Sequence, residues 1–470
     1  MRFVDDFLGE DSPGWLKKYV AGFIAALAVF RFWNSWQFNP YWGYDGGGHI
    51  DYIFSLASGH LPNIATNYLA WHEPLYYLLL APIAFLGRGL HTFGLIQACL
   101  SLGVAALSWL VIRELVQTSW ARALTFTVWN LLPPVVLAST FVTNELLNYF
   151  WILLILLLAL RFSGAPVVIP KPRDPVVFKW IPAFAGMTGV GGRAVYFIGI
   201  ICGLALLTKI TAIVAVFAVV IAQVFRGLSE QQGTVPWSAR WRQPVIIALI
   251  AILMYAPWLA VRTKYVLPSL SINNTSYMAP APLALDNRIW FFAKFDSDIF
   301  KFPYWYSGGR GFWSMIYADT FWDYYGMMQN RNQLASTPAS LKISTDRNGG
   351  EVLRANLVVA RTFPYLAIPL ALIMLIGAFE LLKKPFEMPT LVSFGLFAAL
   401  LYFSYRYPFY DRGIVKSIFI GPAYLPILAA GFGVVEARLK STWGKLAITI
   451  MIFAYVAMLL RVIIMPSLGY

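Results

Sequence analysis

The sequence is poor in charged residues and in cysteine. Only 12% of its 470 residues are charged, whereas an ordinary soluble chain has roughly a quarter. Since 59% are hydrophobic, too few polar groups remain to cover a soluble core of this size. This excludes a cytosolic enzyme, a disordered protein and a fibrous repeat. The two cysteines, Cys99 and Cys202, lie in apolar runs, which excludes a disulfide framework and a cysteine metal site.

The net charge of +14 has a simple explanation in a membrane protein. In a soluble chain it would suggest nucleic acid, but in a membrane protein Lys and Arg collect in cytoplasmic loops beside anionic lipid. We therefore expect the lipid bilayer, and no nucleic acid, as a partner.

The apolar runs predict an all-α polytopic membrane protein. A spanning helix needs about 20 mostly apolar residues. Twelve segments are candidates: 17–36, 75–88, 92–112, 123–140, 143–161, 194–208, 210–225, 244–262, 363–382, 388–404, 415–435 and 446–465. Four acidic residues precede the first run and no small-residue cleavage site follows it, so we expect it to stay as a helix rather than act as a signal peptide.

Orientation follows from the basic residues, which favour the inner side. Lys17 and Lys18 predict a cytoplasmic N-terminus, and residues 37–73 contain no Lys or Arg and are expected outside. Arg113 and Arg122 are expected inside. The chain must then cross the membrane an odd number of times between residue 73 and Arg113, but two candidate segments, 75–88 and 92–112, lie between them. The weakest candidate, 75–88, covers only about 21 Å. We therefore predict about 11 crossings, within roughly 10–13, with 75–88 as a short or incompletely spanning helix and a large outer segment between the seventh and eighth crossings.

Three regions follow from this topology. Residues 1–262 form an N-terminal membrane core, residues 263–360 an aromatic-rich periplasmic segment, and residues 361–470 a C-terminal four-helix membrane region. Within the core, residues 163–193 are rich in Pro and Gly, and their phrase IPAFAGMTG resembles the translated product of a repeated element of proteobacterial genomes. We read this stretch as an inserted cytoplasmic loop without function, an ordinary loop being the alternative, and it indicates a Gram-negative source.

The outer loop 37–73 concentrates ionisable side chains. It contains three of the four histidines and three acids: His49, His60, His72, Asp45, Asp51 and Glu73. Such groups are costly at a membrane face unless they are solvated or used. The three glycines after Asp45 allow a turn and the close approach of a ligand. The alternative is a solvated loop, which fits Asp51 and Glu73 better than Asp45.

Helical spacing separates some of these side chains. If a helix begins near Gly48, His49 and Ile53 share a face and Asp51 points elsewhere. Histidines and carboxylates are adequate ligands for zinc or manganese. No pair has the tight helical spacing of a zinc motif, so we predict no cofactor, and a divalent metal stays an open alternative.

The order of motifs resembles a family. An acid after the first helix, a His four residues on, a G-x-L-P turn at 59–62 and H-E-P-L-Y-Y at 72–77 resemble the GT-C glycosyltransferases that use lipid-linked sugars. The likeness is to bacterial relatives of protein O-mannosyltransferases and aminoarabinose transferases, the glycosyltransferase family 39 type. It implies that Asp45 is the catalytic base, with His49 beside it and Glu73 in the later motif.

Further segments extend the resemblance. GLALLTK at 203–209 resembles the family's helix ending in a basic residue, TNELL at 143–147 its second acidic position, and YAPWLAVR at 255–262 the helix end before the outer segment. The resemblance implies roles for Lys209, Glu145 and Arg262. It also implies seven crossings, a large outer segment and four more crossings.

The outer turn at 404–416 carries cations where the charge rule prefers few: Arg406, Arg412 and Lys416. We expect them to bind an anion; a turn salt-bridged through Asp411 is the alternative. Lys209 is expected at an outer helix end, where it either meets a phosphate or extends to the interface. Arg suits phosphate oxygens as a fork, and Lys acts as a point charge.

Together these features predict a glycosyltransferase of the bacterial inner membrane with a periplasmic active site. The implied partners are a polyprenyl-phosphate-linked sugar and an unknown glycan, lipid or protein acceptor. Asp45 would take the acceptor proton, and cations would stabilise the leaving phosphate. His49 and Glu145 complete the expected catalytic set. The expected substrate contacts are Asp51, His72, Glu73, Lys209, Arg262, Arg406, Arg412 and Lys416.

Two alternatives belong to other classes. One is a transporter or flippase, and the other is a noncatalytic membrane protein of polysaccharide assembly. Transporters place ionisable residues near the bilayer midplane and have related halves. Here the acids gather in an outer loop and the halves differ, which favours the transferase.

Overall fold

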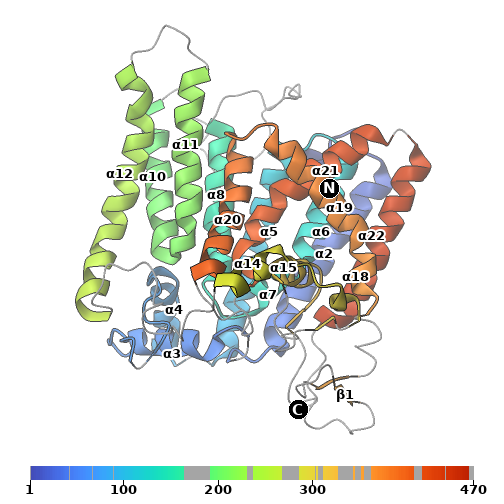
Figure 1. Ribbon diagram of the computed structural model, residues 1–470. Helices are drawn as coiled ribbons and strands as arrows, with labels where there is room; N and C mark the ends of the chain where they lie inside the picture. The colour runs from blue at the N-terminus through green and yellow to red at the C-terminus, as the bar shows by residue number, and fades with distance from the viewer. Residues whose placement is uncertain are drawn as a thin grey trace.

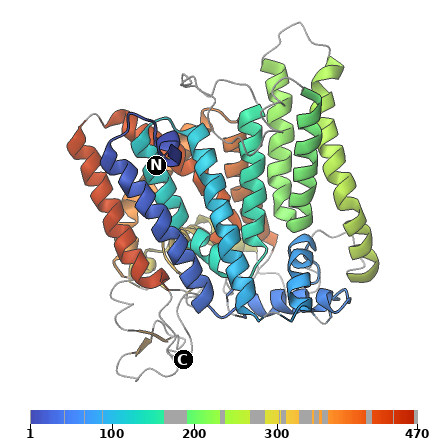
Figure 2. The same ribbon diagram turned by 180° about the vertical axis from the view of Figure 1, so that it is seen from behind.

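The computed structural model shows a bundle of helices (Figures 1 and 2). It describes residues 2–162, 191–229, 237–266, 285–325, 342–344, 351–353, 361–406 and 415–464, without 42, 66, 88, 302, 305–310 and 440. The long helices are α2 (Gly14–Gln37), α5 (His91–Leu115), α6 (Ser119–Leu131), α8 (Glu145–Phe162), α10 (Gly191–Thr208), α11 (Ile213–Ser229), α12 (Trp237–Val261), α19 (Ile368–Leu382), α20 (Met388–Arg406), α21 (Gly421–Arg438) and α22 (Thr442–Ile463).

Shorter elements complete the described chain. The short α-helices are α1 (Arg2–Leu8), α3 (Gly46–Ala57), α4 (Leu75–Phe85), α7 (Pro133–Thr140), α14 (Leu285–Ala293), α15 (Phe312–Phe321) and α18 (Phe363–Leu366). Three 3-10 turns are η2 (Ile210–Ala212), η4 (Ser297–Phe300) and η6 (Ser417–Ile420), and η3 (Arg262–Val266) is π-helical. Strands β1 (Lys342–Ser344) and β2 (Glu351–Leu353) pair antiparallel.

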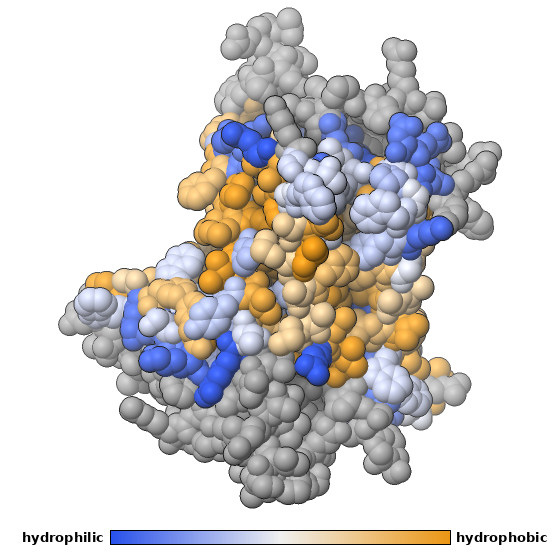
Figure 3. Space-filling view, turned by 90° about the vertical axis from the view of Figure 1, so that its right-hand side faces the viewer, coloured by the Kyte–Doolittle hydropathy of each residue, from blue (hydrophilic) through white to orange (hydrophobic). Residues whose placement is uncertain are grey.

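The protein is a multi-pass membrane protein, as the sequence predicts. Within the described ranges, six helices are long and apolar enough to cross a membrane, and the bent pair of α6 and α7 makes a seventh if it is one span. Figure 3 shows hydrophobic side chains gathered in a band across the middle of one face, with hydrophilic ones above and below it. The count of 11 crossings stays a prediction.

One predicted segment, 123–140, is two helices rather than one. Helices α6 and α7 meet at a bend of 54°. Leu132 is extended, with φ −55° and ψ 133°, because the ring of a following proline disfavours the helical conformation. The buried Arg31 of α2 holds this break, since its guanidinium donates to the carbonyl oxygen of Asn130 at 2.5 Å and to the hydroxyl of Ser139.

The C-terminal ends of α2 and α22 and the start of α5 lie at one face of the bundle, which we call the site face. Asn34 near the end of α2 donates to the carbonyl oxygen of Ile463 at 2.8 Å, and the Trp36 ring lies 5.2 Å from that of His91 at the start of α5. The chain therefore leaves and re-enters the bundle at the same face between these helices. Helix α4 has only 11 residues, in agreement with the prediction that 75–88 is a short helix.

Basic residues gather at the opposite face. There Arg122 of α6 donates to the carbonyl oxygen of Phe7 in α1, Arg161 of α8 pairs with Glu114 of α5 at 3.0 Å, and Lys445 of α22 pairs with Glu436 of α21 at 2.9 Å. Figure 1 places the N-terminus toward this face and α3 across the site face. Which of these two faces is cytoplasmic stays a prediction.

Candidate functional site

Asp45 stands at the start of α3 on the site face. Its φ of 57° lies in the left-handed region, which no other described non-glycine residue adopts, and such backbone strain concentrates at functional sites. Its exposed side chain accepts a hydrogen bond from the hydroxyl of Tyr68 at 2.7 Å. Desolvation raises the pKa of Asp45, but the nearby charge of Lys416 and the Tyr68 hydrogen bond outweigh it and lower the pKa below its usual value. Asp45 is therefore a carboxylate at neutral pH.

The three glycines after Asp45 serve packing more than ligand access. A Cβ at Gly46 would lie 2.9 Å from the backbone carbon and oxygen of Tyr41, and one at Gly48 would lie 2.8 Å from Leu69 Cδ1. At Gly47 the nearest atom would be Tyr41 Cδ1 at 3.9 Å. The expected close approach of a ligand therefore applies to Gly47 alone.

His49 lies behind Asp45 in a buried aromatic layer. Helix α3 begins at Gly46 and buries His49 and Ile53, whereas Asp51 is exposed on the other side, as the spacing predicts. The ring of His49 meets the Tyr77 hydroxyl at 2.8 Å through Nδ1 and lies 6.0 Å from the ring of His72. Burial lowers the pKa of His49 to about 4. This side chain is therefore neutral at pH 7.

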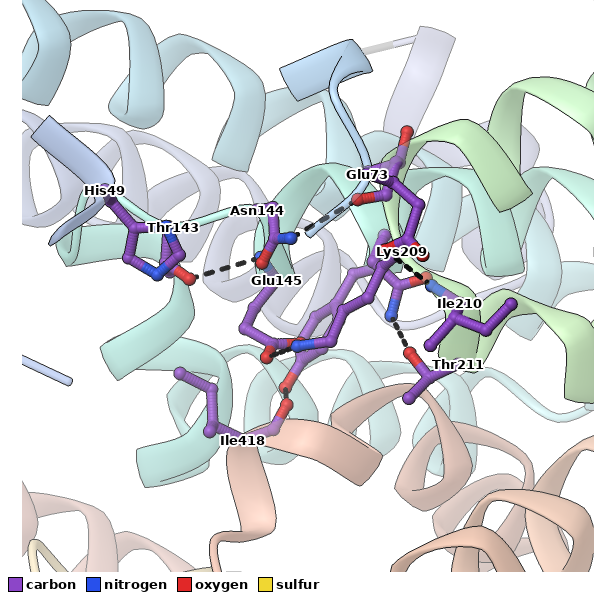
Figure 4. Close-up of polar contacts among 12 residues, drawn as sticks. His49, Glu73, Thr143, Asn144, Glu145, Lys209, Ile210, Thr211 and Ile418 are labelled. Atoms are coloured by element: carbon purple, nitrogen blue, oxygen red, sulfur yellow. Dashed lines mark hydrogen bonds and ion pairs between the residues drawn. The ribbon is translucent and has the colours of Figure 1, made fainter. Parts of the chain in front are cut away.

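Glu73 is fully buried, which contradicts the alternative of a solvated carboxylate. Its two oxygens accept hydrogen bonds from the Ile210 backbone and the Tyr255 hydroxyl, each at 3.1 Å, and Figure 4 shows its approach to Ile210. Burial raises the pKa of Glu73, while the nearby charge of Arg262 opposes that rise. Glu73 thus ties the outer loop to η2 and α12.

Lys209 and Glu145 form a buried ion pair. Lys209 stands between α10 and η2 and is 7% exposed, and Glu145 opens α8 and is 3% exposed. Figure 4 shows the two side chains pointing toward one another. Oxygen Oε2 of Glu145 has no hydrogen-bond partner among the described residues. The alternative in which Lys209 merely extends to the interface does not fit this geometry.

The two lysines of the site converge on Phe419 of η6. The Lys209 ammonium lies 4.8 Å from the centroid of that ring, and the Lys416 ammonium lies 5.9 Å from it and 4.0 Å from the centroid of Tyr44. Burial lowers the pKa of Lys416, and Asp45, Asp319 and Glu145 counteract this effect. Two cations and the carboxylate of Asp45 thus share one region, an arrangement that can hold an anion beside a proton acceptor.

The structure describes the cations expected in the turn 404–416 only in part. Arg406 is exposed at the end of α20. Arg412 and the alternative partner Asp411 lie outside the described residues, as does most of the inserted loop 163–193.

Within the described ranges, no group of three His, Cys, Asp or Glu side chains is arranged to hold a metal ion.

Sequence reasoning missed two residues at the site. Tyr68 bonds Asp45, and Asp319 of α15 lies fully buried beside Ser417. Asp319 is the one acid within the run FWSMIYADTF, and this isolation among apolar residues was the available signal. Nothing in the chain order connects it with Lys416, almost a hundred residues later.

Comparison with known proteins identifies the fold. No protein-family model and no curated protein matches the sequence. In structure the chain is similar to the oligosaccharyltransferase of Archaeoglobus fulgidus in its apo form, with a TM-score of 0.52 and 14% identity over 97% of this chain and 57% of that one. The chain has the GT-C fold.

A second solved structure is ArnT from Cupriavidus metallidurans bound to undecaprenyl phosphate. It has a TM-score of 0.49 and 16% identity over 93% of this chain and 63% of that one. The chain therefore spans 57% and 63% of the length of these two proteins. The all-α GT-C architecture expected from the sequence is confirmed.

Proposed function

We propose that the protein is a membrane glycosyltransferase. It moves a sugar from a polyprenyl-phosphate donor to an acceptor at the periplasmic side of a bacterial inner membrane. The observation that carries this proposal is the convergence of the Asp45 carboxylate with the ammonium groups of Lys209 and Lys416 on the site face. The GT-C fold supports it, as does the undecaprenyl phosphate bound by the similar ArnT structure.

The donor phosphate would bind the two lysines. Lys416 carries its charge beside Asp45, and Lys209 exchanges its partner Glu145 for the phosphate or shares it. Point charges of this kind stabilise a phosphate that gains charge as it leaves.

An apolar groove beside α11 suits the prenyl chain. The groove lies between α11, α20 and the chain that leads into α20, has a volume of about 440 Å³, and includes Val214, which follows η2 closely in the chain. Its wall includes Phe217, Ile221, Leu391 and Phe394. A hydrocarbon chain in such a groove stays within the bilayer while its phosphate meets the cations.

The reaction follows from these positions. An acceptor hydroxyl attacks the anomeric carbon of the sugar, and the bond between that carbon and the phosphate oxygen breaks. Asp45 takes the hydroxyl proton as general base, which requires hydrogen-bonding reach. Polyprenyl phosphate leaves with its charge held by Lys209 and Lys416. Direct displacement of this kind inverts the anomeric centre.

The remaining predicted residues take supporting roles in this proposal. His49 and His72 are buried behind Asp45, and Glu73 with Arg262 fixes the loop against η2 and α12. Asp51 and Arg406 are exposed on the described surface, where they can contact the acceptor or the donor sugar.

A transfer assay tests this proposal. Purified protein in nanodiscs is incubated with radiolabelled polyprenyl-phosphate sugars and an envelope extract. We expect label in the acceptor fraction, and we expect Asp45→Asn to abolish it. The matched control is Asp298→Asn, an exposed acid of η4, which should transfer normally. Movement of labelled donor across liposomes without bond cleavage would replace the transferase with a flippase.

A further inference from the structure

The outer segment holds residues 415–417 by several hydrogen bonds. Asp319 of α15 accepts from the Ser417 backbone at 2.6 Å and from its hydroxyl at 2.9 Å, both through Oδ2. Thr320 donates to the Ser417 hydroxyl at 3.3 Å. Tyr325 donates to the carbonyl oxygen of Val415 at 2.7 Å. The outer segment therefore holds both chain neighbours of Lys416, Val415 and Ser417, by hydrogen bonds.

The held residue, Lys416, faces the candidate base. Its ammonium lies 4.0 Å from the centroid of the Tyr44 ring. Tyr44 directly precedes Asp45 in the chain. The rings of Tyr44 and Tyr325 pack in a T-shaped arrangement, with their centroids 5.8 Å apart. Lys416 thus lies between the outer segment and the start of α3, and its charge acts on both Asp45 and Asp319.

Asp319 is an unusual choice for a purely structural contact. It is fully buried, and its oxygen Oδ1 has no hydrogen-bond partner among the described residues. A buried carboxyl with one unsatisfied oxygen is costly. An Asn or Ser could accept a hydrogen bond from Ser417 at lower cost, so the carboxylate points to a role for its charge.

We propose that Asp319 is a positioning residue that fixes Lys416 beside Asp45. It works through the two hydrogen bonds from Ser417 and through its own charge near the Lys416 ammonium. The inference rests on the proposed function, because positioning Lys416 matters for catalysis only if the donor phosphate binds there. It adds the outer segment, and α15 in particular, to the machinery of the site.

The test combines a double-mutant cycle with two measurements that need no activity. Asp319→Asn and Lys416→Met should each raise the apparent donor KM by about tenfold, the loss of one charged contact. The double variant should show no further rise. In Asp319→Asn, amide hydrogen exchange of the peptide covering 415–419 and acetylation of Lys416 should both become faster. Asp298→Asn should leave all three quantities unchanged.

A milder variant guards against misfolding. Ser417→Ala removes one of the two hydrogen bonds to Asp319 and should shift exchange and acetylation in the same direction by a smaller amount. Unchanged exchange and acetylation in Asp319→Asn would overturn the inference, and so would KM effects that multiply in the double variant. If the wild type transfers no sugar, the proposed function fails, while exchange and acetylation still decide whether Asp319 positions Lys416.

Discussion

The buried pair of Lys209 and Glu145 gives the sharpest stability prediction. Lys209→Met keeps an unbranched apolar side chain, one heavy atom shorter, in the place of the lysine beside Phe419 and removes the charge. Glu145, which is 3% exposed, then loses the cation bonded to Oε1, and among the described residues its Oε2 has no hydrogen-bond partner either. Breaking a buried pair from one side costs about 3–5 kcal/mol. We expect a loss of this size in the free energy of unfolding.

The double variant and a surface pair define the controls. Adding Glu145→Gln to Lys209→Met removes both charges and should recover at least half of the loss, because no buried charge stays behind. The exposed pair of Lys384 and Glu387 at 3.1 Å is the reference, and Lys384→Met should cost under about 1 kcal/mol. Urea unfolding in micelles, followed by tryptophan fluorescence, measures the wild type and the three variants. A cost for Lys209→Met no greater than that for Lys384→Met would refute the reasoning.

Three further predictions follow from burial and packing. Burial lowers the pKa of His49 to about 4, so its ring should stay neutral in nitrogen-15 NMR spectra down to about pH 5; a charged ring at pH 6 would contradict this. Gly46→Ala places a Cβ 2.9 Å from Tyr41 backbone and should cost about 1–3 kcal/mol in thermal unfolding, whereas Gly47→Ala should be nearly neutral. Burial raises the pKa of Asp319 from 3.8 to about 7. The charge that Asp319 places near Lys416 therefore costs stability, and the free energy of unfolding of the wild type should fall as the pH rises from about 4 to about 7. Asp319→Asn avoids this cost, so the difference in Tm between this variant and the wild type should be more favourable to the variant at pH 8 than at pH 5.

The helices could be predicted because apolar length is a local property. Segments such as 388–404 and 446–465 correspond closely to α20 and α22. The bend between α6 and α7 could also have been predicted from Pro133 and Pro134. The prediction of segment 123–140 used only the length of the apolar run, which does not take prolines into account. The buried Arg31 that holds this bend contacts residues about a hundred positions away, which no local pattern reveals.

The site was predictable only in part. The spacing of α3 correctly separated His49 from Asp51, because helix periodicity fixes which residues share a face. The burial of Glu73 was not predictable, since it depends on Ile210 and Tyr255 from distant helices. Asp319 was missed for the same reason, because its partner Ser417 comes from the far end of the chain.

The central claim is that Asp45 is the general base of a sugar transfer. The most direct test is single-turnover transfer from a radiolabelled polyprenyl-phosphate sugar by wild type and Asp45→Asn, with donor binding measured in parallel. We expect the rate to fall by about 10²–10⁴-fold while donor binding is retained, since Lys209 and Lys416 stay in place. Transfer by Asp45→Asn at the wild-type rate would contradict the account.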